Sequence, residues 1–101
     1  MKQIVIISPL DAIEIFKQLG FATLVSGDVE EISNYVKTNI ATTKVFIYDF
    51  GLKNIFQSIR EKYKDSAFPI FVALALEKDK IEASLLEANR QIENAIGVKI
   101  E

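Results

Sequence analysis

The chain has 101 residues, of which 50% are hydrophobic and 26% charged, a composition that fits one globular domain and excludes a wholly disordered chain. Its formal net charge is −2, and the 12 basic residues are interleaved with the 14 acidic ones, so no nucleic-acid partner is expected. Cysteine and histidine are both absent, which excludes disulfides, thiolate metal sites and the residue most often used for proton transfer.

Apolar segments of the sequence are short. The opening residues 1–10 hold too few continuous apolar positions for a signal sequence, and no run reaches the roughly 18 residues of a membrane span. We therefore expect a cytoplasmic protein that does not insert into the membrane.

Four apolar runs alternate with four segments of helical periodicity, a pattern typical of a parallel sheet with crossover helices. The runs predict strands at residues 4–7, 22–25, 45–48 and 70–74. Because these runs are continuously apolar, both faces of the sheet should be covered. The sequence thus predicts a single α/β domain over residues 1–101, with right-handed crossovers that place two helices on each face of a four-stranded parallel sheet.

Capping patterns mark where the first two helices begin. Ser8 is expected to cap the first helix, with Pro9 in its first turn, and Gly20 is expected to end it. Asp28 is expected to cap the second helix. The apolar face of that second helix should lie on the sheet and contains Val29, Ile32, Val36 and Ile40.

The third helix has the clearest amphipathic pattern in the chain. Its apolar positions recur at helical spacing and are Leu52, Ile55, Phe56, Ile59 and Tyr63. The last helix should end at Ile96 with Gly97 as its left-handed cap, but two capping boxes, at Asp79 and at Ser84, leave its start open.

The C-terminal helix, taken as about 84–96, and the residues just before it carry apolar positions that step by four and three. These residues are Ile81, Leu85, Ala88, Ile92 and Ala95. This heptad seam fits the groove of another long helix or a coiled coil, and it could equally pack on the sheet of its own domain.

Few residues at the expected carboxyl ends of the strands could support chemistry. The loop after the first strand lacks the glycines of a phosphate-binding loop. Asp49, which follows the third strand, resembles the phosphoacceptor of receiver domains. Receivers bind a divalent metal with an acidic pair after the first strand, where this chain has Ser8 and Pro9. Asp11 could substitute as a ligand, although a helix-capping role fits it better, and Asp49 could simply cap a turn.

The order of the segments resembles the F subunit family of the vacuolar-type and archaeal-type rotary ATPases, whose members are small Rossmann-like proteins of about this length. The resemblance rests on the group Phe16, Leu19 and Gly20, on Pro69 before the fourth strand, and on the tail at residues 92–100. Members of this family usually have a glycine and an aspartate where Ser8 and Pro9 stand here.

This resemblance implies a noncatalytic central-stalk protein that turns with the rotor and binds the coiled coil of the D subunit of that rotor. Such a protein couples ATP hydrolysis or synthesis to proton or sodium transport, and it is peripheral to the membrane on its cytoplasmic side. No catalytic residue, cofactor or metal is expected in this chain. The implied partner-binding residues are Leu85, Ala88, Arg90, Ile92, Glu93 and Ala95. The alternative hypothesis is a receiver-like signalling domain phosphorylated at Asp49.

Overall fold

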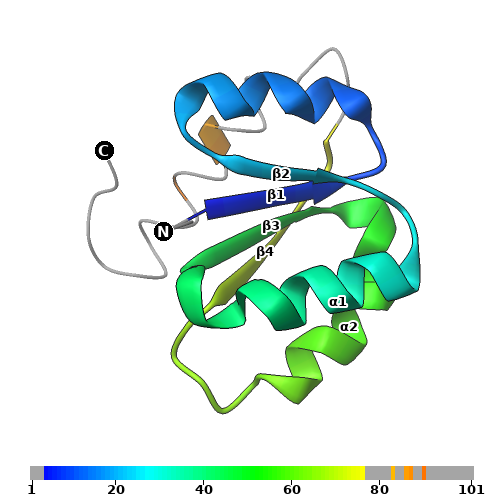
Figure 1. Cartoon of the computed structure of the whole chain (residues 1–101), viewed down its shortest axis with the longest axis vertical. Coiled ribbons are helices and arrows are strands. Elements are labelled where there is room, and N and C mark those ends of the chain that lie inside the picture. The colour runs from blue at the N-terminus through cyan, green and yellow to red at the C-terminus, as the bar shows by residue number, and fades with distance from the viewer. Residues whose placement is uncertain (1–3, 77–82, 84–85, 88–89, 91–101) are drawn as a thin grey trace.

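The computed structural model of the chain describes residues 4–76 and, beyond them, residues 83, 86, 87 and 90. Its strands are β1 (Ile4–Ser8), β2 (Ala22–Val25), β3 (Val45–Asp49) and β4 (Ile70–Leu74). They form a parallel sheet in the order β2-β1-β3-β4 (Figure 1). The predicted strands and the predicted Rossmann-like α/β fold are confirmed.

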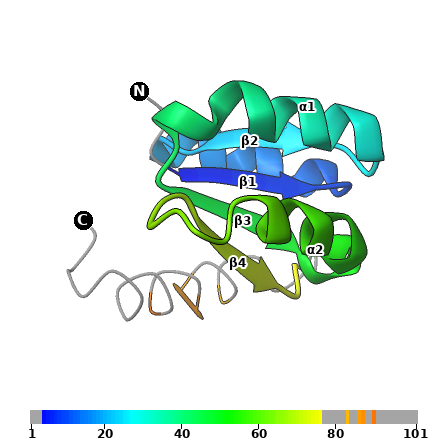
Figure 2. The same cartoon turned by 90° about the horizontal axis from the view of Figure 1, so that it is seen from below.

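Helices cover both faces of this sheet. Within residues 4–76 they are η1 (Asp11–Leu19), α1 (Val29–Asn39), η2 (Ile40–Thr42), η3 (Phe50–Leu52) and α2 (Lys53–Lys62). Both α1 and α2 lie against one face, and η1 lies against the other (Figures 1 and 2). The pair of helices predicted for one face is therefore confirmed. On the other face the predicted second helix is the C-terminal one, most of which lies outside the described residues.

The prediction for the start of the first helix is wrong. The helix begins at Asp11 and its cap position is Leu10, which makes no side-chain capping bond. Ser8 is instead the last residue of β1, with its backbone in the sheet. The segment is a 3-10 helix, in which apolar residues spaced by three share one ridge, and Ile13 and Phe16 on that ridge are buried.

Gly20 ends η1 as predicted. Its φ is 89°, in the left-handed region that glycine adopts without steric cost. The N–H of Gly20 and the N–H of Phe21 then donate to carbonyls of the last turn, which satisfies backbone groups left over at the end of the helix.

The predicted capping of α1 by Asp28 is confirmed, and part of its predicted apolar face is buried. The Asp28 carboxylate accepts a hydrogen bond from the Glu31 N–H at 2.8 Å. Ile32 and Val36 are buried against the sheet. The predicted face also includes Val29, but this residue is 56% exposed, because it is the first residue of the helix and lies beyond the core.

The sheet separates two apolar cores, because successive residues of each strand point to opposite faces. The core under η1 contains Ile4, Ile6, Ile13, Phe16, Val45, Ile47, Val72, Leu74 and Leu76. The core under α1 and α2 contains Val5, Ile7, Ile32, Val36, Phe46, Tyr48, Leu52, Phe56 and Ile59. The predicted apolar stripe of the third helix supplies three of the buried residues in this second core, namely Leu52, Phe56 and Ile59.

Candidate functional site

The carboxyl ends of β1 and β3 bring together the two polar residues that end these strands. Ser8 is fully buried, and its hydroxyl donates to Oδ2 of Asp49 at 3.0 Å. The other carboxylate oxygen of Asp49 accepts from the Gly51 N–H at 3.0 Å, so Asp49 caps η3. The predicted role of Asp49 as a turn or helix cap is thereby confirmed.

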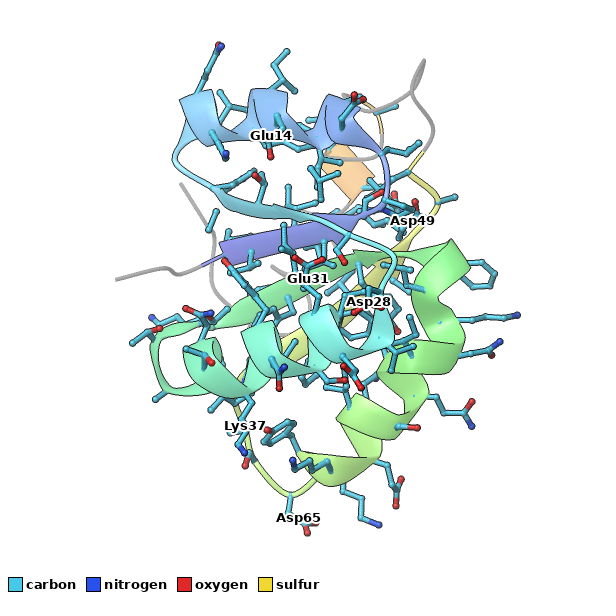
Figure 3. All side chains as sticks on the ribbon, turned by 45° about the vertical axis from the view of Figure 1, so that its right-hand side comes forward. Glu14, Asp28, Glu31, Lys37, Asp49 and Asp65 are labelled. Atoms are coloured by element: carbon cyan, nitrogen blue, oxygen red, sulfur yellow. The ribbon has the colours of Figure 1, made fainter. Side chains whose placement is uncertain are left out.

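The loop after β2 is tied to the same end of the sheet. The Ser26 N–H donates to the Ser8 carbonyl at 2.9 Å, and the Ser26 hydroxyl accepts from the Asp28 N–H at 3.0 Å. Ser8 also accepts a bond from the Leu10 N–H through its hydroxyl. Figure 3 shows Asp49 and Asp28 at this end of the sheet. These bonds connect the loops after β1, β2 and β3 into one network.

The charges near this network are sparse. Asp11, the acid considered as a metal ligand, is exposed in the first turn of η1. Within the described ranges, no group of three or more carboxylates could hold a metal ion. The receiver-like alternative stays a prediction, although both oxygens of its proposed phosphoacceptor already accept hydrogen bonds.

One carboxylate away from the strand ends has a shifted pKa. Hydrogen bonds from Lys17 and then from Thr23 hold the pKa of the Glu14 carboxyl below its usual range. Glu14 is labelled on η1 in Figure 3, and Thr23 belongs to β2. The bond between Glu14 and Thr23 therefore joins η1 to the sheet at the molecular surface.

Arg90 alone among the predicted partner-binding residues is described by the structure. It is helical and exposed, and its guanidinium contacts both carboxylate oxygens of Glu87, an ion pair that raises the pKa of Arg90. Ala83 and Leu86 are also helical. The remaining predicted positions lie outside the described residues and are Leu85, Ala88, Ile92, Glu93 and Ala95.

The structure also shows surface features that the sequence patterns do not reveal. Leu86 is 72% exposed and lies one helical turn before Arg90. A groove of about 410 Å³ runs between α1 and α2, with Val29 and Ile55 among its lining residues. A second groove, of about 690 Å³, lies between α2 and β4. The first groove lies between two helices that β3 separates in the sequence, and the second lies between the consecutive elements α2 and β4. Both grooves depend on how these elements pack in three dimensions, so local periodicity gives no signal for them.

Comparison with known proteins identifies no relative of this chain. No family model matches the chain, and no curated protein or solved structure does so either. In the part of the chain that the structure describes, no helix has the length and apolarity needed to cross a membrane.

Proposed function

We propose that this chain is a noncatalytic central-stalk component of a vacuolar-type or archaeal-type rotary ATPase. Its partner is the coiled coil of the D subunit of the rotor, with which it turns inside the catalytic headpiece. ATP chemistry belongs to other subunits, and this chain transmits torque between nucleotide turnover and proton or sodium transport. In the cell it is peripheral to the membrane on the cytoplasmic side.

The observation that carries this proposal is the closed hydrogen-bond network at the carboxyl ends of the strands. Parallel α/β sheets bind their ligands at this end, where polar side chains and open loops receive them. Here Asp49 instead accepts bonds from Ser8 and from Gly51, and Ser26 is bonded to the loop after β1. Side chains committed in this way support a role in which binding occurs on the outer surface.

The C-terminal segment supplies the surface for docking. Leu86 and Arg90 are spaced by four residues on a helical segment, and both are exposed. A long apolar side chain beside a guanidinium suits a helical partner, because the apolar group contributes buried area and the cation contributes orientation. This pair supports extending the partner surface beyond the predicted seam to include Leu86.

The first test measures copurification of ATPase subunits. The tagged chain is incubated with native membranes of the organism that encodes it, washed at moderate salt, and the bound proteins are identified by mass spectrometry. We expect headpiece and stalk subunits with the unmodified chain. A double variant, Leu86→Asp with Arg90→Glu, should recover roughly tenfold less of them, since it removes one apolar anchor and reverses one charge.

The matched control is Leu19→Asp, because Leu19 is an exposed leucine in a different element of the fold, η1. It should recover as much ATPase as the unmodified chain. Failure of the unmodified chain to recover any ATPase subunit would contradict the proposal. Equal loss in the control and the double variant would show that the C-terminal segment is not the docking surface.

A further inference from the structure

A groove between α2 and β4 combines the outer edge of a strand with basic side chains. Its volume is about 690 Å³, and it is lined by residues of α2, by β4 and by the loop that joins them. Figure 2 shows β4 at the end of the sheet beyond β3, with α2 nearby. This groove belongs to neither the strand-end network nor the C-terminal segment.

The outer edge of β4 presents backbone groups for hydrogen bonding. β4 pairs with β3 on one side, and no strand among the described residues pairs with its other side. The Ile70 N–H donates to the Lys44 carbonyl at 2.8 Å, so the backbone of Ile70 faces β3. Since successive residues alternate between the two edges of a strand, Phe71 and Ala73 direct their N–H and C=O groups outward.

The same two residues form part of the groove floor. Phe71 and Ala73 are partly buried on the face covered by α2. The Phe71 ring stacks on Phe46, with centroids 5.6 Å apart and planes 12° apart, and contacts Phe56 with centroids 6.2 Å apart. This packing fixes the ring, so the floor is preformed. An extended peptide along β4 could pair with the backbone and place alternate side chains over this floor.

The charged side chains that line the groove favour one kind of extended peptide over others. Three basic residues line the groove, Lys53, Arg60 and Lys64, against one acid, Glu61. Glu61 is already paired with Lys64 at 2.8 Å. Arg60 donates to the Tyr48 hydroxyl, so its cation is held beside the groove. In a chain with a net charge of −2, this local excess of positive charge favours an acidic occupant.

Two other occupants fit less well. A second copy of this chain, paired through β4 in antiparallel fashion, would place both α2 helices on the same face and bring their basic residues together. A single-stranded nucleic acid would suit the cations, but its backbone cannot match alternating N–H and C=O groups.

From these observations we infer that the groove between α2 and the outer edge of β4 binds an extended acidic segment of a partner polypeptide, which adds a fifth strand to the sheet. This surface is separate from the one proposed for the rotor coiled coil, and its test does not require any ATPase subunit.

The experiment uses a fluorescent blocked peptide of alternating glutamate and valine, about eight residues long, and the full chain. Fluorescence anisotropy should show saturable binding that weakens as salt is added. Hydrogen exchange should slow at the Phe71 and Ala73 amides when the peptide is present. The variant Lys53→Glu with Lys64→Glu should bind on the order of tenfold more weakly.

The matched control variant is Lys37→Glu with Lys62→Glu, which makes the same change in net charge at lysines outside this groove. It should bind like the unmodified chain. Three results would each overturn the inference: no binding of the acidic peptide, equal binding by a peptide with N-methylated valines, or displacement of the peptide by single-stranded oligothymidine. Equal weakening in both double variants would also overturn it, since the effect would then reflect net charge alone.

Discussion

The hydrogen bond between Ser8 and Asp49 joins residues 41 positions apart in sequence. A buried serine hydroxyl needs a partner, because leaving it without one costs free energy comparable to its lost hydration. Asp49 provides that partner, and Gly51 occupies the other oxygen. At the scale of single residues, the carboxylate therefore acts as a structural connector between two strand ends.

Replacing this connector should destabilise the fold. We expect Asp49→Ala to lower the free energy of unfolding by about 2 kcal/mol, since it removes two hydrogen bonds and leaves the Ser8 hydroxyl buried without its acceptor. Urea denaturation measures the change. Asp65→Ala is the matched control, because Asp65 is exposed in a turn, and its effect should stay within about 0.5 kcal/mol.

The same residue decides between the structural role and the receiver-like alternative. Incubating the unmodified chain with radiolabelled acetyl phosphate and Mg²⁺ should give no labelling if Asp49 serves only as a connector. Labelling that disappears in Asp49→Asn would contradict this expectation and establish the phosphoacceptor role.

Thr43 differs from Ser8, because its buried hydroxyl lacks a hydrogen-bond partner within the described residues. The residue lies just before β3. We expect Thr43→Val, which keeps the shape of the side chain, to raise the free energy of unfolding by about 1 kcal/mol. Thermal and urea denaturation test this. A destabilised variant would show that the hydroxyl does have a partner.

At the scale of elements, α2 is held to the sheet by aromatic packing. Phe56 is fully buried, and its ring stacks on that of Tyr48 with centroids 4.1 Å apart and planes 6° apart. Such pairs add to the free energy gained by burying the rings. This contact fixes α2 over β3 and so sets one wall of the groove beside β4.

Removing that ring should loosen α2. We expect Phe56→Ala to cost about 3–5 kcal/mol of unfolding free energy, the usual range for a buried phenylalanine. Phe50→Ala is the control, since Phe50 is nearby in sequence but 53% exposed, and it should cost about 1 kcal/mol or less. Similar losses in both variants would contradict the role assigned to the Phe56 stack.

The helices and strands differ in how well the sequence alone predicts them. All four strands were predicted correctly. The runs of β1, β3 and β4 contain four or five consecutive apolar residues, whereas the run of β2 is a weaker signal because it contains Thr23. The start of η1 was not, because a serine before a proline looks like a helix cap until its true partner, Asp49, is known. The exposure of Val29 was likewise hidden, since periodicity assigns a face without showing where the core ends.

At the scale of the whole molecule, the sheet order brings three kinds of surface to different places. The strand-end network lies at the carboxyl edge, the basic groove lies along the outer edge of β4, and exposed Leu86 lies on the C-terminal segment. Sequence patterns identified the strand ends as a place to look for a site and the C-terminal segment as a docking surface. They could not predict the groove, because its basic residues come from α2 and the loop after it, whereas its backbone edge comes from β4.

The polar pair at the strand ends has a consequence for how the strands align. A slip of one residue exchanges the two faces of a strand, and in most sheets this error is costly because one face is polar. In β1, the residues on both faces are isoleucine or valine from Ile4 to Ile7, so hydrophobicity alone would tolerate such a slip. Ser8 would not, because a shifted β1 separates its hydroxyl from Asp49 and its carbonyl from Ser26. The network that closes the strand ends thus also selects one alignment among several that an all-apolar strand could adopt.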